Sequence, residues 1–376
     1  MGPSTPSISH VATGSKADRP RVGLVLGAGG VIGGAWLTGG LQALATETGW
    51  DPMSADHIVG TSAGSMIGAL CGSGVPCWFM VAHSAGETFD GLVDVEGRPA
   101  HEADRSAGAV FRLHKAPPPI GPGSWKLALK SLSNPRGHTP GALLSGWLPR
   151  GVISTEPLRQ TVRRVVPRGW STHPNLWVVA CDYETGKRVP FGHPDAPAAD
   201  LTDAVAASCA IPGFYHPVTI NGRRYVDGGM HSPSNLDILR DEDLDIVICL
   251  NPTSSLHSIP PRHPVERLHA FMRNASGRRL GSERKKLEEA GKEVVLIQPT
   301  ARDLEIMGGN LMSRKRRHDV IELSMRTVAK QLRRAGVRDL LRDLPPGDPD
   351  RIRRPQGPPS EWPRPTWTEQ TKSSVA

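Results

Sequence analysis

One serine stands in a spacing of glycines that is typical of a catalytic nucleophile. Residues 60–64 read Gly-Thr-Ser-Ala-Gly, so that Gly60 and Gly64 flank Ser62 in the G-x-S-x-G pattern of a nucleophile elbow. In that motif a tight turn between a strand and a helix holds the serine away from its own backbone, and small neighbours avoid clashes. The helix also directs its positive N-terminal dipole at the serine oxygen. This spacing predicts that Ser62 attacks an acyl carbon.

A run of glycines near the N-terminus supplies candidate donors for an oxyanion. Gly29-Gly30 and Gly33-Gly34 follow an apolar segment, and free backbone N–H groups in such a loop can stabilise a tetrahedral intermediate. A dinucleotide fingerprint is the rival interpretation, since glycines after a first strand also cradle a pyrophosphate. However, the G-x-G-x-x-G spacing counted from Gly27 needs glycine where the chain has Ile32. We therefore favour the oxyanion interpretation.

The third group is Asp227, Gly228 and Gly229, a sequence that by itself is typical of a hairpin turn. Alternatively, the Asp227 carboxylate could accept the Ser62 proton directly, if the two side chains lie within hydrogen-bond reach. The Ser-His-Asp triad of an ordinary α/β-hydrolase stays open as a further alternative. Its candidate histidines are His216, His231 and His257. Against the triad, only 33 residues separate Gly29 from Ser62, and an α/β-hydrolase usually needs more strands between these features.

Short apolar runs separated by turn residues indicate the elements that position these motifs. Strands are expected at Val22–Leu26, His57–Val59, Leu176–Cys181, Lys187–Phe191, Asp245–Leu250 and Glu293–Ile297, with the third and fourth forming a hairpin. Helices are expected at Ile32–Leu44, Met66–Leu70 and along the apolar stripe Ile321, Met325, Val328 and Leu332. Strands that alternate with helices predict an α/β layered sheet. Asn235 is expected to cap the segment that begins at Leu236.

The composition is that of a globular chain without a membrane span or a structural metal site. Among 376 residues, 41 are glycine and 35 are proline, a share below that of low-complexity sequence. The five cysteines are scattered and include no CxxC pair, so neither a zinc site nor a disulfide framework is expected. No apolar run reaches the roughly 18 residues of a membrane span, and residues 1–20 lack the apolar core of a signal peptide. We expect a cytoplasmic protein whose membrane contact, if any, is peripheral.

The positive charge is uneven and suggests how the chain is organised. Residues 261–340 hold 19 Lys or Arg against 10 Asp or Glu, in a chain with a net charge of +8. We predict a disordered N-terminal tail (1–20), a domain that holds the motifs (21–260) and a basic, mostly helical part (261–343) packing on that domain. Residues 88–150, rich in Gly, Pro and Lys or Arg, predict an irregular, lid-like excursion. The proline-rich residues 344–376 predict a second disordered tail.

In this order, the glycine run, the elbow and the Asp-Gly-Gly sequence resemble the patatin-like phospholipase family. So does the stretch ASCAIPGFYHPVTINGRRYVDGG at residues 207–229, and the similarity spans roughly 22–240. The resemblance implies a three-layer α/β/α sandwich around a mostly parallel sheet, and a Ser–Asp dyad that needs no metal or other cofactor. It assigns Ser62 as nucleophile and Asp227 as proton acceptor. The implied oxyanion hole is Gly29, Gly30 and Val31, and the implied supporting glycines are Gly33, Gly60, Gly64, Gly228 and Gly229.

The resemblance also implies a substrate class and shows two departures. Fatty-acyl esters of phospholipids, lysophospholipids or related lipids are the implied substrates, met at a membrane or micelle surface. Ala28 stands where the first of three glycines is usual, and Ile32 stands where the family usually has Arg or Lys. The lost charge leaves a weakly active or non-catalytic lipid- or partner-binding protein as the alternative to a lipid acyl hydrolase.

The basic segment raises the question of partners. Residues 261–340, together with Trp125 and Trp147, could contact an anionic membrane through charge and aromatic anchoring. The same segment could instead cover the sheet with its apolar face and leave its charges in solvent. Nucleic acid is not expected, since no recognised module accompanies the charge, and the sequence names no protein partner.

Overall fold

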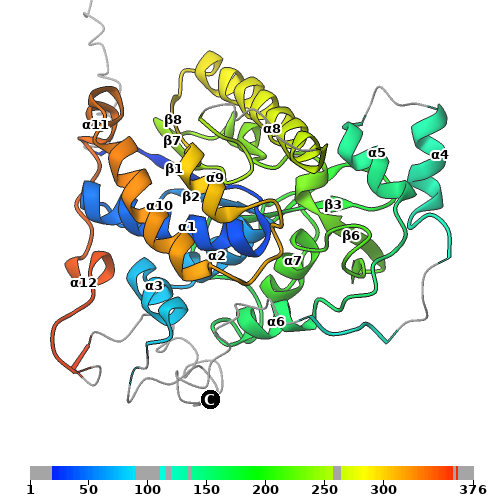
Figure 1. Ribbon diagram of the computed structural model, residues 1–376, viewed down its shortest axis with the longest axis horizontal. Coiled ribbons are helices and arrows are strands. Elements are labelled where there is room, and N and C mark those ends of the chain that lie inside the picture. Colours follow the sequence, from blue (N-terminus) through cyan, green and yellow to red (C-terminus); the bar gives the residue numbers. More distant parts are fainter. Residues whose placement is uncertain are drawn as a thin grey trace, which may run out of the picture.

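The protein folds into three layers, in which a mixed sheet lies between two layers of helices (Figure 1). The computed structural model describes residues 19–87, 89, 111–115, 120–133, 138–256, 264–358 and 361–362. Within these residues it has eight strands and twelve α-helices. This arrangement confirms the predicted α/β/α sandwich.

The strand order in the sheet is β5-β6-β3-β2-β1-β7-β8, and β4 pairs with β3. The strands are β1 (Val22–Leu26), β2 (His57–Thr61), β3 (Leu176–Asp182), β4 (Arg188–Phe191), β5 (Val218–Ile220), β6 (Arg223–Asp227), β7 (Ile246–Leu250) and β8 (Glu293–Ile297). Neighbours from β3 to β8 along this order are parallel, whereas β4 and β6 are antiparallel to β3, and β5 is antiparallel to β6. The sheet is therefore mostly parallel, as expected.

Helices and short 3-10 turns connect these strands. The helices are α1 (Gly30–Thr48), α2 (Ala63–Gly72), α3 (Cys77–Ala85), α4 (Trp125–Ser133), α5 (Pro140–Trp147), α6 (Glu156–Arg163), α7 (Leu201–Ser208), α8 (Pro264–Glu289), α9 (Ala301–Met307), α10 (Arg317–Leu332), α11 (Ala335–Leu341) and α12 (Pro349–Ile352). The 3-10 turns are η1 (Pro52–Ser54), η4 (Gly228–Met230) and η5 (Leu236–Leu239).

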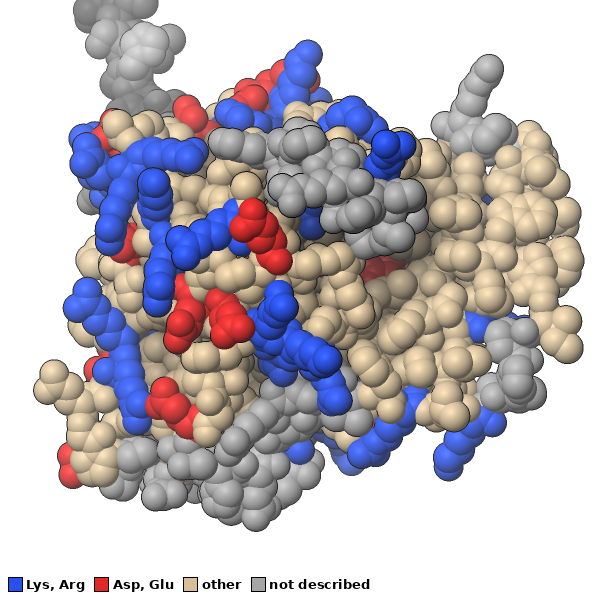
Figure 2. Space-filling model, viewed as in Figure 1, with Lys and Arg blue, Asp and Glu red and all other residues tan. Residues whose placement is uncertain are grey.

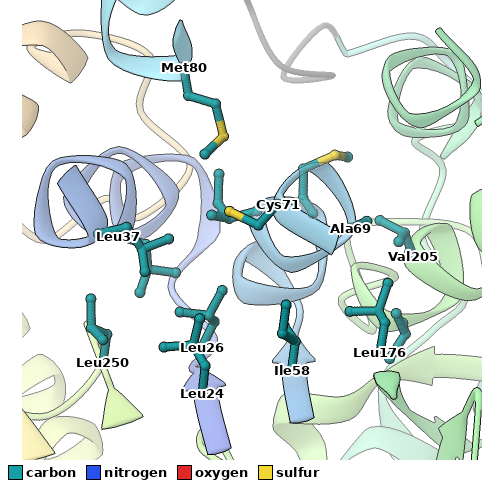
Figure 3. Packing of buried hydrophobic residues seen from close by; sticks show 14 of the residues in the cluster. Leu24, Leu26, Leu37, Ile58, Ala69, Cys71, Met80, Leu176, Val205 and Leu250 are labelled. Atoms are coloured by element: carbon teal, nitrogen blue, oxygen red, sulfur yellow. The ribbon is translucent and has the colours of Figure 1, made fainter. Parts of the chain in front are cut away.

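Alternate residues of each strand point to opposite faces of the sheet and bury against different helices. On one face, Leu24, Leu26 and Ile58 point toward Leu37 of α1 and Ala69 of α2 (Figure 3). On the other face, the intervening strand residues pack against α8 and η5. Burial on both faces is typical of parallel strands in an α/β sheet.

Most of the predicted elements are present. The strands at Val22–Leu26 and Glu293–Ile297 match the prediction residue for residue, and β3 and β4 form the predicted antiparallel hairpin. Helix α1 is longer than the predicted Ile32–Leu44, although it contains five glycines. One of these glycines has a packing role, because a methyl group at Gly39 would lie 2.1 Å from the Ser324 hydroxyl of α10. The glycines thus allow two helix backbones to approach closely.

The segment 88–150 differs from the irregular excursion expected there. Residues 90–110 lie outside the described part, but α4 and α5 form a two-helix hairpin that packs on the sheet. Leu127 of α4 and Ala142 of α5 bury in one cluster with Tyr183 and Val226. Their apolar pattern is short and interrupted by glycine and proline, which is why the sequence did not reveal two helices.

The C-terminal stretch also differs from the disordered tail expected from residue 344. Helix α12 lies within it, and the Ile352 carbonyl oxygen accepts a hydrogen bond of 3.0 Å from the Gln42 side chain of α1. The buried Trp362 meets Trp78 of α3 edge to face, with ring centroids 5.2 Å apart. Burial of this aromatic ring offsets the extended preference of the prolines around it. The rest of the tail, and residues 1–18, lie outside the described part.

We predict opposite effects for two glycine-to-alanine substitutions inside helices. Gly39→Ala should lower the free energy of unfolding by about 1–3 kcal/mol, because the methyl group would overlap α10. Gly277→Ala in α8 is the matched control, since nothing lies within 4 Å of its added methyl group. It should raise the free energy of unfolding by about 0.5–1 kcal/mol through helix propensity alone. Urea unfolding of the two variants measures both effects, and a neutral Gly39→Ala would contradict the close α1–α10 contact.

Candidate active site

Strand β3 brings the ends of two other strands together. Strand β2 pairs with β3 as far as Thr61, which lies opposite Val179. The pairing of β6 begins at the next residue of β3, where Asp227 lies opposite Ala180. Strand β4 runs along the other side of β3 at these positions. Consequently β2 and β6 share one side of β3 and approach each other end to end. Asp227 and Ser62, the two residues of the predicted dyad, lie at the meeting point.

The turn at Ser62 has the backbone of a nucleophile elbow. Ser62 has φ 53° and ψ −120°, a conformation that residues with a side chain rarely adopt. Both flanking glycines are required by close approach. A methyl group at Gly60 would lie 2.5 Å from the Ser65 Cα, and one at Gly64 would lie 1.9 Å from the Leu26 carbonyl oxygen. The elbow therefore depends on the two glycines of the motif.

Three side chains hold this strained turn in place. The Ser208 hydroxyl accepts the Ser62 N–H at 2.9 Å and donates to the Val179 carbonyl oxygen at 2.6 Å, which ties the elbow to β3. The Ser62 carbonyl oxygen accepts the Ser65 hydroxyl at 2.6 Å and the Cys209 thiol at 3.2 Å. The backbone of Ser62 is thus fixed on both sides, so that its hydroxyl has a defined position.

Asp227 places a buried carboxylate beside that hydroxyl. It accepts a hydrogen bond from the Gly229 N–H at 2.7 Å. Burial raises the pKa of the Asp227 carboxyl to about 6, although the Gly229 N–H and the nearby Ser62 hydroxyl oppose the shift. A carboxylate that titrates near neutral pH and contacts a serine hydroxyl can accept its proton without a histidine.

The glycine run contacts both the elbow and the turn after Asp227. Besides the contact of Leu26 with Gly64, a methyl group at Gly34 would lie 3.7 Å from the Ala63 Cβ. On the other side, one at Gly229 would lie 3.5 Å from the Ala28 Cβ. The three motifs, which are far apart in sequence, therefore converge at the carboxyl ends of β1 and β2 and the end of β6.

Helix α1 begins inside the glycine run and leaves backbone donors at its start, as the first turn of any helix does. The Ile32 N–H donates to the Leu311 carbonyl oxygen at 3.0 Å. In contrast, the N–H groups of Gly29, Gly30 and Val31 have no hydrogen-bond acceptor in the described part of the chain. Gly30 has φ 61°, and a methyl group on it would lie 2.7 Å from the same Leu311 oxygen. The three N–H groups predicted as oxyanion donors are therefore unpaired within the described residues.

Ile32, at the position expected to carry a cation, is a core residue. Its side chain is 1% exposed and belongs to the larger apolar cluster. A charged side chain with the same orientation would lose its hydration. The next residue, Gly33, donates to the Gly29 carbonyl oxygen at 2.9 Å and packs near Pro252. Apolar packing thus holds the start of α1 in this chain.

Asn235 lies at the predicted position directly before η5, but its side chain ties two parts of the site together instead of capping the turn. It has φ 49° and makes no side-chain capping hydrogen bond to η5. Its amide instead donates to the Thr61 hydroxyl at 3.1 Å and to the Ser232 carbonyl oxygen at 2.6 Å. The end of β2 is thereby linked to the segment that follows Asp227.

The candidate histidines of a triad lie elsewhere. Burial lowers the pKa of His231 to about 4, and the positive charges of Arg188 and Arg279 act in the same direction. His216 stacks on His114, with ring centroids 3.9 Å apart, and His257 falls outside the described residues. Neither member of the dyad has a histidine as a hydrogen-bond partner in the described ranges. The same ranges contain no group of His, Cys, Asp or Glu side chains arranged to hold a metal ion.

Sequence reasoning did not single out several residues of this site. Ser208 and Cys209 lie in a stretch of small and apolar residues, and only the fold places them beneath Ser62. The one signal that could have identified them is their place in the stretch 207–229, which carries the family resemblance. Leu311 contributes a backbone carbonyl oxygen, which residue type cannot reveal.

Comparison with known proteins identifies a related family. A family model described as "Patatin-like phospholipase" matches residues 24–240, which include the glycine run, the elbow and Asp227. Among solved structures, the crystal structure of VipD from Legionella pneumophila is similar over 84% of this chain and 68% of that chain. Its sequence identity is 13% and its TM-score is 0.34.

We predict that Asp227→Asn stabilises the folded protein at neutral pH. The pKa of Asp227 is about 6, against an ordinary value of 3.8, so between these values the folded state keeps a proton that the unfolded chain loses. The stability contributed by this proton is complete below about pH 4 and is lost as the pH rises to about 6. An asparagine side chain is uncharged at every pH, so the Asp227→Asn variant does not lose this stability as the pH rises.

Urea unfolding at about pH 5 and about pH 7 measures the effect. The advantage of Asp227→Asn over the natural chain should grow by about 1–2 kcal/mol between these pH values. Asp343→Asn is the control, because the Asp343 side chain is 77% exposed beside Arg342, and its difference from the natural chain should stay constant. An Asp227→Asn advantage independent of pH would show that the carboxyl is not buried as described.

Proposed function

Because the chain belongs to the patatin-like phospholipase family, we propose that it is a serine-dependent hydrolase of fatty-acyl esters in phospholipids, lysophospholipids or related lipids. The observation that carries the proposal is the position of Ser62, on its strained elbow, beside the buried carboxylate of Asp227, whose pKa the Ser62 side chain lowers. The N–H groups at the start of α1 that have no acceptor among the described residues lie on the segment that contacts the elbow and the turn after Asp227. Nucleophile, base and oxyanion donors together support acyl transfer.

In the proposed first half-reaction, the Ser62 oxygen attacks the ester carbonyl carbon while the Asp227 carboxylate takes the hydroxyl proton. The carbonyl oxygen becomes an oxyanion that accepts hydrogen bonds from Gly29, Gly30 and Val31. When the tetrahedral intermediate collapses, the bond to the alcohol oxygen breaks and Asp227 returns the proton to that oxygen. The products are an acyl group on Ser62 and the free alcohol or lysolipid.

In the second half-reaction, water replaces the serine as nucleophile. Asp227 takes a proton from the water as its oxygen bonds to the acyl carbon, and the same N–H groups stabilise the second oxyanion. Collapse breaks the bond to the Ser62 oxygen, which recovers its proton from Asp227. The fatty acid leaves, and both residues return to their starting states. The burial that raises the pKa of Asp227 makes it a stronger proton acceptor than an exposed carboxylate.

A non-catalytic lipid- or partner-binding protein is the second candidate. Ile32 is the observation that favours it, since the position that usually carries a cation is occupied by a core residue. Against it, the backbone donors beside Ile32 do not depend on a charge, because helix α1 itself leaves them without an acceptor. The two candidates differ in whether turnover requires Ser62.

We predict that Ser62→Ala lowers kcat/KM for ester hydrolysis by about a thousandfold or more. Fatty-acid release from phospholipids, lysophospholipids and short-chain esters is the measurement, and it also ranks the substrate classes. Ser73→Ala is the matched control. Ser73 is buried at the C-terminal end of α2, the helix that follows Ser62, and its hydroxyl has no hydrogen-bond partner among the described residues. Equal rates for the natural chain and Ser62→Ala would assign the protein to the second candidate.

The pH dependence of hydrolysis should report the base. With a soluble short-chain ester, kcat/KM should fall on the acid side with an apparent pKa of about 6, as Asp227 takes up a proton. His231→Ala should leave this limb in place, because the pKa of His231 is about 4 and its charged neighbours are not the dyad. A limb near pH 4 that disappears in His231→Ala would restore the Ser-His-Asp triad.

A further inference from the structure

Exposed apolar side chains gather on the hairpin formed by α4 and α5. Nine of the twelve large apolar side chains that are exposed among the described residues lie between positions 111 and 152. Those on α4 recur at i, i+4 and i+7, and those on α5 at i and i+3, so each helix carries one stripe. We call them the hairpin face: Trp125, Leu129, Leu132, Leu144 and Trp147, which are between 45% and 71% exposed.

The hairpin face points away from the sheet because the opposite sides of both helices are already buried. Leu127 and Ala142 pack in a cluster with Tyr183, and the Trp147 indole N–H donates to the Ser131 hydroxyl at 2.9 Å. This hydrogen bond holds the two helices together beside the exposed stripes. A contiguous apolar surface of this kind usually marks a place where something binds.

The chain segment that forms the hairpin carries charge of one sign. Residues 106–155 contain six Lys or Arg, of which Arg136 lies outside the described residues, and no Asp or Glu. Lys126 pairs with Glu184 of the β3–β4 turn at 2.8 Å, whereas the next cation on α4, Lys130, has no ion pair among the described residues. In Figure 2 the surface over α4 and α5, at the right, is uncharged over most of its area, while both signs alternate over α10 and α11 at the left. An apolar face flanked by cations is complementary to an anionic lipid surface.

The hairpin is attached to the turn that follows Asp227. The Thr139 hydroxyl, at the start of α5, donates to the Met230 carbonyl oxygen at 2.9 Å, and Met230 ends the 3-10 turn η4. The contact is close, because a methyl group at Gly141 would lie 2.6 Å from the same oxygen. Whatever binds the hairpin face is therefore brought to helices that abut the proposed active site.

Two other assignments fit these observations less well. A second copy in a two-fold contact would set cations against cations, with no acidic residue on the hairpin to pair with them. The basic segment 261–340 pairs much of its charge within the protein. Examples are Arg284 with Glu288, Lys286 with Asp237 and Arg333 with Glu47. Its charge therefore fits a solvated helix surface better than a docking surface.

We propose that the α4–α5 hairpin is the surface by which this protein docks on an anionic lipid bilayer. The hairpin face enters the boundary between head groups and acyl chains, and the surrounding Lys and Arg lie among the anionic head groups. No helix in the described part is long and apolar enough to span a membrane. Helices α4 and α5, with nine and eight residues, are long enough to contact one leaflet. This inference deepens the proposed function by naming the surface that delivers lipid to Ser62. Only the delivery to Ser62 rests on the proposed function, and the docking itself does not.

Binding of the full chain carrying Ser62→Ala to phosphatidylcholine vesicles, with and without phosphatidylserine, tests the docking without consuming lipid. Binding should require phosphatidylserine and weaken as salt is added. Adding Trp125→Ala and Leu129→Ala should lower the partition coefficient by about tenfold or more, while Leu340→Ala, on α11 at the opposite end of the molecule, should not. Thermal unfolding checks that each variant is folded. We expect every variant to fold, because the replaced side chains are exposed.

A charge reversal and a site-specific label complete the test. Lys130→Glu should weaken binding, whereas Arg338→Glu, the same charge change on the exposed surface of α11, should not. All five native cysteines are buried, so Leu129→Cys and Leu340→Cys can each carry a polarity-sensitive dye. The dye at 129 should shift to the blue on vesicle addition and the dye at 340 should not.

Three outcomes would overturn the docking proposal. They are equal loss of binding in the α4 and α11 variants, a blue shift at 340 alone, and a dimer in solution that the Trp125→Ala and Leu129→Ala variant abolishes. Each concerns binding by a protein that lacks the nucleophile. Failure of the docking proposal is therefore distinguishable from failure of the hydrolase proposal, which depends on the rate difference between the natural chain and Ser62→Ala.

Discussion

The register of β3 is the constraint on which the arrangement of the site depends. Because β2 ends opposite Val179 and β6 ends opposite Ala180, a slip of one residue would separate the two strand ends and turn every side chain of the slipped strand to the other face. Burial on both faces prevents this, since Val178 packs in one apolar cluster and Val179 in the other. Ser208 adds a direct link from β3 to the elbow. The position of the dyad is therefore a property of the core.

The site combines several features that are individually unfavourable for folding. Ser62 has a backbone conformation that favours glycine, Asp227 is a carboxylate removed from water, and three backbone donors at the start of α1 have no acceptor in the described structure. Such features persist where the surrounding structure over-determines them. Here the surroundings are the buried strands β1, β2 and β3, most of whose apolar residues belong to the two largest clusters. The same rigidity gives the proposed nucleophile and base fixed positions before a substrate binds.

Elements with local signals could be predicted from the sequence, and elements that depend on distant contacts could not. The apolar runs at Val22–Leu26 and Glu293–Ile297 are bounded by turn residues, so both ends of each strand were predictable. The elbow and the Asp-Gly-Gly sequence could be predicted because each is defined by the spacing of neighbouring residues. In contrast, Asn235 follows a local rule for helix caps but bonds to Thr61 from another strand, and the Leu311 carbonyl oxygen leaves no trace in residue type. The α4–α5 hairpin was missed because its buried positions are few.

The pairing of β1 with β7 shows that the folded domain extends beyond the part of the chain that matches the family. The family match ends at residue 240, yet one whole edge of β1 is paired with β7 (Ile246–Leu250), which in turn pairs with β8. The chain then returns to the glycine run, where Leu311 accepts the Ile32 N–H. A fragment cut at the limits of the match would keep every motif residue and lose half of the hydrogen bonding of its first strand. In this chain the segment that matches the family is thus shorter than the segment that must fold together.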